Sequence, residues 1–333
     1  MITEEKYVGL SESNAEVAGM KIENQISGLV ESKFQEAPVE LKKITTGLCN
    51  EVYLIKLKSG EEFILRFNSD RKDIAGSSRN IPLFREYGIK VPEIVFEDYT
   101  KSEFPCYYQI LSKIDGQDIG QVFFDLDEDE LRSIAGELSE VTLKLRKMPT
   151  NGRFGYVGEN ENSTFDSWLD FILSRIREWK SRDEKTNVLG DEFLGILDDI
   201  IEKYSSYFES VESELYYDDM CSKNIMINKG KFSGIVDLDS ITYGDYLEVL
   251  GTIQASYLDT ESGDIYLNSM MENLDLNGKE REMVDVYTVI TLISWLTEEG
   301  VEFNTNTTTE INWDEVASKK EKIRRVYQQI ESD

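Results

Sequence analysis

The segment ELYYDDMCSKNIMINKGKFSGIVDLDS, residues 214–240, holds two acidic clusters on either side of a short apolar hairpin. The runs NIMIN and FSGIVDLD read as β-strands, and KGK supplies the turn between them. We expect this hairpin to bring Asn224, just before the first strand, near Asp237, just after the second. Asp219 lies on the preceding loop, within reach of a substrate proton.

The residue types in this pattern are those that phosphoryl transfer requires. Asn224 and Asp237 offer the oxygen ligands that Mg²⁺ prefers, and Asp219 is the candidate general base for an acceptor hydroxyl. A lone D-x-x-x-x-N also occurs in solvated loops of acidic proteins. The D-x-D of Asp237 and Asp239 also fits haloacid-dehalogenase phosphatases and glycosyltransferases, but the sequence lacks their matching Thr or Lys pattern and their α/β repeat.

Charge and residue usage exclude several classes of function. The 333 residues include 36 basic and 65 acidic side chains, a formal charge of −29, which disfavours nucleic acid and anionic membranes and favours cationic ligands. The absence of histidine excludes Ser-His-Asp and Cys-His hydrolases and histidine-liganded metal sites. Three widely spaced cysteines predict a reducing cytoplasm. No run reads as an export signal or a membrane span.

The first third of the chain reads as a helix followed by a small sheet. An amphipathic helix is expected over residues 20–35, and VYLIKL and EEFILRFN read as two strands joined by a KSG turn. A short helix ending near Gly88, a strand after Pro92 and a strand in CYYQILSKIDG follow.

Helices dominate the remainder. Apolar residues recur every three or four positions over 131–145 and 165–179, and a last helix is expected over 313–331. The prediction is therefore a two-lobed α+β fold, with a β-rich lobe over residues 1–112 and a helical lobe over 113–333 that contains the hairpin.

Taken in order, these motifs resemble the aminoglycoside phosphotransferase family of the protein-kinase-like superfamily, and most of all its hygromycin B phosphotransferase subgroup. The family's catalytic loop reads His-x-Asp-x-x-x-x-Asn, followed by a strand with Ile-Asp and then Gly-Asp; YDDMCSKN, IVDLD and YGD occupy those places. The similarity runs from about residue 40 to residue 260. It implies a kinase-like fold with a small antiparallel N-lobe sheet, and ATP- or GTP-dependent transfer to a hydroxyl of an aminoglycoside-like acceptor. The lobe over residues 1–112 would then bind the nucleotide, and the lobe over 113–333 would carry the catalytic loop, the metal-binding hairpin and the acceptor site.

The resemblance also implies roles for single residues. Asp219 matches the catalytic base, and Asn224 and Asp237 match the Mg²⁺ ligands. Lys223 would steady the transferred phosphoryl group, with a solvent-facing lysine as the alternative. The implied nucleotide contacts are Gly47 and Asn50 in TTGLCNEVYLI, Arg66 in FILRFNS, and Leu111 and Lys113 in the hinge-like YYQILSKIDGQDI.

Three positions depart from the family pattern. Tyr217 replaces the His before the catalytic Asp, and Arg66 replaces the usual phosphate-contacting Lys. Arginine can make bidentate phosphate contacts, so Arg66 suits this role. The family's helix offers a Glu partner for that base, but IAGSSRNIPLFRE has none, and only Asp73 and Glu86 are nearby. Either the partner has moved or the nucleotide clamp is weaker.

Alternatives stay open at this point. The acceptor could be a choline-, homoserine- or macrolide-like alcohol, since a fold does not fix its substrate, and a pseudokinase would bind nucleotide without transfer. Asp245, followed by Tyr-Leu and Glu248, predicts a structural capping box. No oligomeric state follows from the sequence. Acidic C-lobe residues either line a cleft for a cationic acceptor or belong to a generally acidic surface: Asp259, Glu261, Asp264, Glu298 and Glu299.

Overall fold

The computed structural model describes residues 12–45, 49–159, 163–220, 222–302 and 308–332, with side chains from residue 21 onward. Contacts divide the chain into two compact units. Unit 1 comprises Met1–Asp115 with Val236–Asp239, and unit 2 comprises Gly116–Ile235 with Ser240–Asp333. The short segment that carries Asp237 and Asp239 therefore makes its contacts within the N-terminal unit. The assignment of nucleotide binding to one part and acceptor binding to the other stays a prediction.

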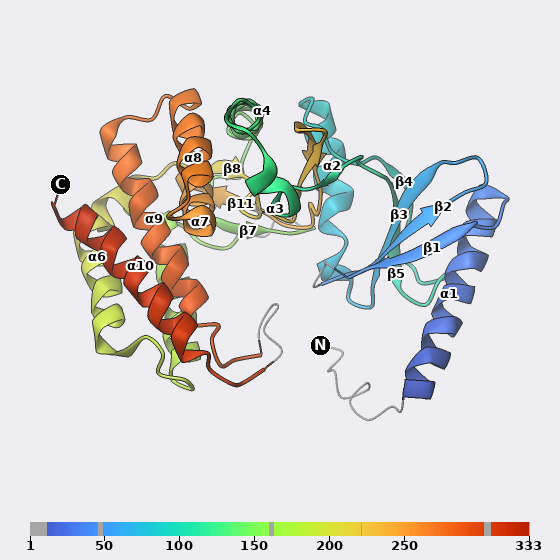
Figure 1. The fold of residues 1–333 in the computed structure, drawn as a ribbon, viewed down its shortest axis with the longest axis horizontal. Coiled ribbons are helices and arrows are strands. Elements are labelled where there is room, and N and C mark those ends of the chain that lie inside the picture. Colours follow the sequence, from blue (N-terminus) through green and yellow to red (C-terminus); the bar gives the residue numbers. More distant parts are fainter. Residues whose placement is uncertain (1–11, 46–48, 160–162, 221, 303–307, 333) are drawn as a thin grey trace. The chain divides into compact units, whose positions relative to one another are not determined.

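Unit 1 is built on an antiparallel sheet of five strands in the order β1-β2-β3-β5-β4 (Figure 1). β2 and β3 form the predicted hairpin, and Gly60 in its turn has a φ of 90°, which glycine adopts without strain. The register places Arg66 of β3 opposite Gln109 of β5. The strands are β1 Glu40–Ile44, β2 Glu51–Lys56, β3 Glu62–Asn68, β4 Ile94–Asp98 and β5 Tyr107–Ser112.

Helix α1 (Glu12–Phe34) contributes one side of the apolar core of unit 1. Ile26, Leu29 and Val30 recur at helical spacing, and they are buried in one cluster with strand residues such as Leu65. The helix begins earlier than the predicted residue 20. The apolar periodicity starts only there, so the sequence pattern gave no signal for the first turns.

A short helix lies between β3 and β4, as predicted. The 3₁₀ turn η2 (Arg71–Asp73) leads into α2 (Gly76–Glu86). The helix ends at Glu86, and Gly88 follows with a φ of 68°, a left-handed conformation that commonly terminates helices. This helix carries Ser77 and Asn80, two buried polar residues that matter for the site.

Unit 2 is mainly helical, and its helices pack around two small three-stranded sheets. One sheet has the order β10-β9-β6 and the other β7-β11-β8. The strands are β6 Gln117–Asp118, β7 Gly155–Val157, β8 Glu214–Tyr216, β9 Ile225–Asn228, β10 Lys231–Ile235 and β11 Ile241–Gly244. The helices are α3 Ile119–Val122, η3 Phe123–Asp125, α4 Glu128–Leu145, α5 Trp168–Asp183, α6 Gly190–Ser210, α7 Leu247–Tyr257, α8 Glu261–Asn273, α9 Gly278–Leu296 and α10 Trp313–Ser332.

The predicted helical stripes of unit 2 are confirmed in α4 and α5, but Phe165, the first residue of the second stripe, precedes α5 and forms an isolated bridge with Phe154. In α4 the apolar positions of the stripe are buried, and a capping box formed by Asp127 and Glu130 begins the helix. In α5 the buried positions include Trp168, Ile172 and Trp179. Because these side chains fill the core, they position the neighbouring elements and take no direct part in chemistry.

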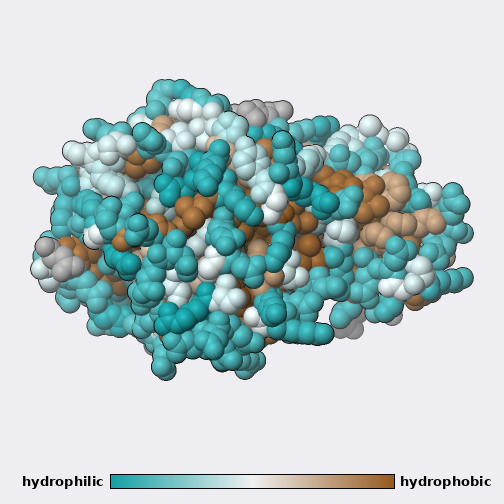
Figure 2. Space-filling view, turned by 90° about the horizontal axis from the view of Figure 1, so that it is seen from above, coloured by the Kyte–Doolittle hydropathy of each residue, from teal (hydrophilic) through white to brown (hydrophobic). Residues whose placement is uncertain are grey.

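The surface is mostly polar, in line with the acidic composition. The face shown in Figure 2 is largely hydrophilic, with hydrophobic areas scattered among the polar side chains. Among the described residues, no helix has both the length and the apolar character needed to cross a bilayer.

Candidate active site

The predicted hairpin forms, and it positions the loop that carries Asp219. β9 and β10 pair antiparallel, and Lys229 and Gly230 turn the chain with φ values of 53° and 72°. Positive φ at both central residues suits the right-handed twist of a hairpin. The loop before β9 runs from β8 to Asn224, so the sheet fixes one end of this loop and the hairpin fixes the other.

Asp219 and Asn224 are brought together on this loop. The Asn224 side-chain nitrogen donates to the Asp219 carboxylate at 2.7 Å and to its backbone carbonyl at 3.0 Å. Asn224 is 6% exposed, whereas Asp219 is exposed. A buried amide thus holds a carboxylate that faces solvent. Tyr217, which stands in place of the family's histidine, is fully buried and anchors the loop by packing.

Arg66 forms the centre of a polar cluster in unit 1. Its side chain is 6% exposed and makes ion pairs with Asp239, through Nη2, and with Asp237, through Nη1 at 3.3 Å. Burial alone would lower the pKa of the guanidinium, but the two carboxylates outweigh this effect and the pKa is raised. Arg66 therefore stays charged. Of the two alternatives left by the sequence, a moved partner or a weaker clamp, the structure agrees with the first: neither Asp73 nor Glu86 pairs with Arg66, and its counter-charges come from the segment after β10.

Asp239 is held by several donors besides Arg66. Its carboxylate accepts from the Asn50 side chain at 3.2 Å and from the Ser77 backbone N–H at 3.3 Å. Asn80 fixes the adjoining backbone by donating to the Leu238 carbonyl at 2.9 Å. The two aspartates of the D-x-D motif therefore have different surroundings. Asp239 is enclosed by α2, β3 and Asn50, while the Asp237 side chain is 49% exposed.

Close packing at the start of α2 depends on a glycine. A Cβ built on Gly76 would lie 1.7 Å from the Asp239 carbonyl oxygen, so no larger residue fits without moving backbone. The sequence placed Asp237 among the site residues but gave no signal for the role of Asp239. Its partners are more than 160 residues away along the chain, and no local pattern reports such a contact.

The other predicted nucleotide contacts lie in different surroundings. Asn50 is half-buried and links Asp239 to Asn68, whose side chain donates to it at 3.2 Å. Leu111 is buried in β5, and Lys113 pairs with Glu62 at 2.8 Å. Gly47 lies outside the described residues. These four assignments to nucleotide binding stay predictions.

The donor types at the site suit a hard cation. Asn224 directs its amide nitrogen at Asp219, so its amide oxygen points away from that carboxylate. Asp237 has a φ of 62°, an unusual conformation that aspartate tolerates better than most residues, and it presents its carboxylate at the surface of unit 1. An amide oxygen and a carboxylate fit Mg²⁺. Lys223 is exposed on the loop that carries Asp219.

Asp245 has a structural role, as predicted, but the capping box is wrong. The carboxylate accepts from the hydroxyls of Tyr207 and Tyr287, each at 2.7 Å, and from the Leu247 N–H at 3.0 Å. Burial raises its pKa to about 6, although the two tyrosine hydrogen bonds oppose this rise. Glu248 forms an ion pair with Arg175 and does not bond to the helix start.

The sequence similarity extends well beyond these residues. The pattern of the Phosphotransferase enzyme family (APH) matches residues 40–281. No curated protein sequence matches the chain significantly.

Solved structures share the fold over most of their length. The apo form of a thermostable mutant of aminoglycoside phosphotransferase APH(4)-Ia superposes with a TM-score of 0.67 at 17% identity, over 91% of this chain and 98% of that chain. A second mutant of that enzyme, in ternary complex with AMP-PNP and hygromycin B, gives 0.64 at 17% identity over the same shares. The GDP and kanamycin complex of APH(2")-IIIa gives 0.68 at 14% identity, again over 91% and 98%.

Proposed function

Because the chain belongs to the Phosphotransferase enzyme family, we propose that it transfers the γ-phosphate of ATP or GTP to a hydroxyl of an aminoglycoside-like acceptor. The observation that carries this proposal is the exposed Asp219 held by the buried Asn224. A carboxylate fixed at a surface in this way is suited to orient an acceptor hydroxyl and to take its proton.

Arg66 is the proposed phosphate-binding residue. It remains charged in its buried position, and among the described residues its Nε atom has no hydrogen-bond partner. A phosphate oxygen would supply an acceptor for such a donor, and charge-assisted hydrogen bonds of this kind are strong. Asn50, Leu111, Lys113 and Gly47 complete the proposed nucleotide contacts.

Asn224 and Asp237 are the proposed Mg²⁺ ligands. When bound, Mg²⁺ would neutralise charge on the nucleotide phosphates. The chain's own residues do the rest: Arg66 orients phosphate, Asp219 holds the acceptor hydroxyl and receives its proton, and Lys223 adds positive charge near the transferred group. Catalysis of this type is positioning and charge stabilisation, so it needs no covalent intermediate on the protein.

Two observations support an aminoglycoside-like acceptor. Two of the similar structures are complexes of aminoglycoside phosphotransferases, one with hygromycin B and one with kanamycin. The net charge of −29 favours a molecule that carries several ammonium groups. Membership of the hygromycin B subgroup is part of this proposal, as is a cytoplasmic location, which the three widely spaced cysteines support.

A panel of acceptors tests the proposal. Purified protein would be incubated with ATP or GTP, with and without MgCl₂, and with hygromycin B, kanamycin, choline or homoserine, and products would be detected by mass spectrometry. We expect a phosphorylated aminoglycoside only when Mg²⁺ is present. If choline or homoserine were phosphorylated and the aminoglycosides were not, the proposed acceptor class would be wrong, but the proposed phosphotransfer reaction would stand.

A further inference from the structure

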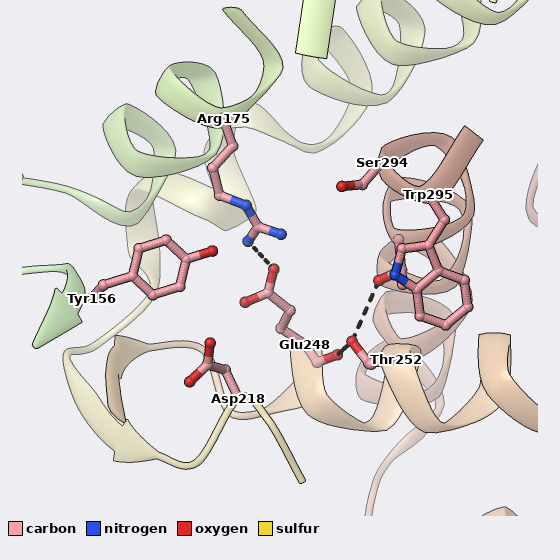
Figure 3. Close-up of a pocket in the computed structure, with 8 residues that line it drawn as sticks. Tyr156, Arg175, Asp218, Glu248, Thr252, Ser294 and Trp295 are labelled. Atoms are coloured by element: carbon pink, nitrogen blue, oxygen red, sulfur yellow. Dashed lines mark hydrogen bonds and ion pairs between the residues drawn. The ribbon is translucent and has the colours of Figure 1, made fainter. Parts of the chain in front are cut away.

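A small pocket lies in unit 2 beside the catalytic loop. It has a volume of about 100 Å³. A cavity needs about 10–15 Å³ of such space to hold one water molecule, so this pocket has room for a small functional group. The side chains that define it come from β7, α5, the catalytic loop, α7 and α9 (Figure 3), and are Tyr156, Arg175, Asp218, Glu248, Ser294 and Trp295.

Two of the charged groups in this pocket neutralise each other. Arg175 and Glu248 form an ion pair whose side chains are 17% and 7% exposed. Glu248 also accepts a hydrogen bond from the buried Tyr216 hydroxyl. Burial alone would lower the pKa of Arg175, but Glu248 and the surrounding tyrosines raise it, so the guanidinium stays charged. This ion pair lines one side of the pocket and contributes no net charge to it.

Asp218 is the remaining charged residue that lines the pocket. Its Oδ1 atom is buried and has no hydrogen-bond partner among the described residues. Burial, followed by the charges of Asp219 and Glu248, raises its pKa to about 7. The Thr242 hydroxyl offsets this rise only in part, and among the described residues it makes no hydrogen bond of normal geometry. A buried carboxylate in this state is costly unless a cation joins it.

The rest of the lining suits a cation with N–H donors. Figure 3 shows the Tyr156 hydroxyl and the Asp218 carboxylate directed into the same space, with the Ser294 hydroxyl facing it from α9. Tyr156 is 51% exposed at the edge of the pocket, and Trp295 is half-buried. Hydroxyl oxygens accept hydrogen bonds from an ammonium group, and aromatic rings attract cations.

We propose that this pocket binds one protonated amino group of the acceptor, with Asp218 as its counter-charge. This inference rests on the proposed function, since it concerns the molecule that Asp219 deprotonates. Asp218 and Asp219 are consecutive, and consecutive Cα atoms are about 3.8 Å apart. Because the two residues are adjacent, the bound amine would lie on the same ring of the acceptor as the reacting hydroxyl or on an adjoining ring.

The same charges argue against an acidic acceptor. An acceptor carboxylate in this pocket would meet Asp218 and Glu248, and the only guanidinium among the described lining residues is already paired. Like charges at such short range oppose binding. The pocket thus favours amino alcohols without a carboxylate over homoserine-like molecules.

The test uses two small probes that differ chiefly in charge. 2-Deoxystreptamine, a diaminocyclitol, and myo-inositol, a neutral cyclitol, would each be titrated into the full chain by ligand-observed NMR. We expect binding of the diaminocyclitol alone, and at least tenfold weaker binding by Asp218→Asn. Asp129→Asn, which removes an exposed charge from α4, serves as the matched control and should bind as the parent chain does.

A second variant guards against misfolding of the first. Ser294→Lys places a positive charge in the pocket while leaving Asp218 in place, so it should also abolish binding of the diaminocyclitol. Equal binding by the parent chain, Asp218→Asn and Ser294→Lys, each with an unchanged melting temperature, would overturn the inference.

Steady-state kinetics separate this inference from the proposed function. With kanamycin as acceptor, Asp218→Asn should raise KM at least tenfold and change kcat by a smaller factor. Transfer with an unchanged KM in this variant would overturn the amine site while leaving the phosphotransfer intact. Loss of diaminocyclitol binding in Asp218→Asn, in a chain that phosphorylates no aminoglycoside, would support the amine site and overturn the proposed acceptor.

Discussion

Asn224 donates from its side-chain nitrogen to the Asp219 carboxylate at 2.7 Å, across a loop of only four intervening residues. This hydrogen bond is buried on the amide side and open to solvent on the carboxylate side. It joins the two functions that the loop is proposed to serve, since one residue would bind the metal and the other the acceptor.

Replacement of Asp219 should separate transfer from nucleotide binding. In Asp219→Ala the acceptor hydroxyl loses its proton acceptor, so transfer should fall by roughly 10²–10⁴, the usual contribution of general acid–base catalysis. Nucleotide affinity should change by a few-fold at most. Single-turnover transfer to kanamycin and calorimetry with AMP-PNP measure the two quantities. Transfer at the parent rate would remove Asp219 from the mechanism.

The two aspartates of the D-x-D motif should have opposite phenotypes. Asp239→Asn weakens a buried ion pair with Arg66, so we expect a loss of roughly 3 kcal/mol in the free energy of unfolding. Asp237 is half exposed, so Asp237→Asn should cost about 1 kcal/mol or less and instead weaken Mg²⁺-dependent nucleotide binding. Urea unfolding without nucleotide, and calorimetry with and without MgCl₂, check the pair. If Asp237→Asn lost stability and Asp239→Asn lost Mg²⁺-dependent nucleotide binding, the roles assigned to the two aspartates would be reversed.

Asp245 should make folding stability fall as pH rises. Its folded pKa of about 6 lies above the unfolded value. Between pH 4 and 6 the folded chain therefore holds a proton that the unfolded chain has released, and stability decreases as pH increases through this window. Asp245→Asn has no ionisable group here, so it lacks this pH-dependent contribution to the free energy of unfolding. Relative to the parent, the variant should gain stability between pH 4.5 and 7.5, by about 2 kcal/mol. Urea unfolding at pH 4.5 and pH 7.5 measures this gain. If variant and parent differed in free energy of unfolding by the same amount at both pH values, Asp245 would not have a raised pKa.

Gly244 in β11 should tolerate no side chain. A Cβ at this position would lie 2.1 Å from the ring of Trp168, which is fully buried. We expect Gly244→Ala to lower the free energy of unfolding by roughly 1–3 kcal/mol through overpacking. Gly195 in α6 is the matched control, since a Cβ there meets no atom within 4 Å among the described residues. Gly195→Ala should stabilise the helix by about 0.5–1 kcal/mol. Thermal unfolding of both variants tests the contrast.

Cation binding at Asp218 should strengthen as pH rises. With a pKa of about 7 in the empty pocket, the carboxylate is mostly neutral at pH 6 and mostly charged at pH 8. Arg175, Glu248, Tyr156 and Asp219 also face or adjoin it, and the first two remain paired. Methylguanidinium keeps its charge throughout, so its affinity should rise about tenfold from pH 6 to pH 8 in NMR titrations. A flat profile would show that Asp218 does not bind the cation.

Much of the fold could be predicted because its signals are local. Apolar spacing gave α4 and α5, alternating apolar runs gave β2 and β3, and the KGK turn gave the β9–β10 hairpin. Strands β7, β8 and β11 were not predicted, because three or four residues are too few to show a period. Their pairing depends on partners far away in the sequence.

The candidate site was predictable in part for the same reason. Asp219 and Asn224 are five residues apart, so their spacing is visible in the sequence. The partner of Arg66 could not be predicted, because Asp239 lies 173 residues away. Nothing in the sequence distinguishes it from the acidic residues that lie nearer to Arg66 in the chain. For Glu248 the local signal was misleading. The sequence predicted a capping box, but the side chain forms a long-range ion pair with Arg175 instead.

The noncontiguous makeup of unit 1 limits how this protein can be dissected. The four residues Val236–Asp239 belong with the N-terminal unit by their contacts, so a fragment that stops at Asp115 would contain Arg66 without either counter-charge. A buried guanidinium left alone in this way costs several kcal/mol. A truncated N-terminal fragment should therefore be unstable, and a stable one would need the Val-Asp-Leu-Asp tetrapeptide grafted back onto it or supplied in trans.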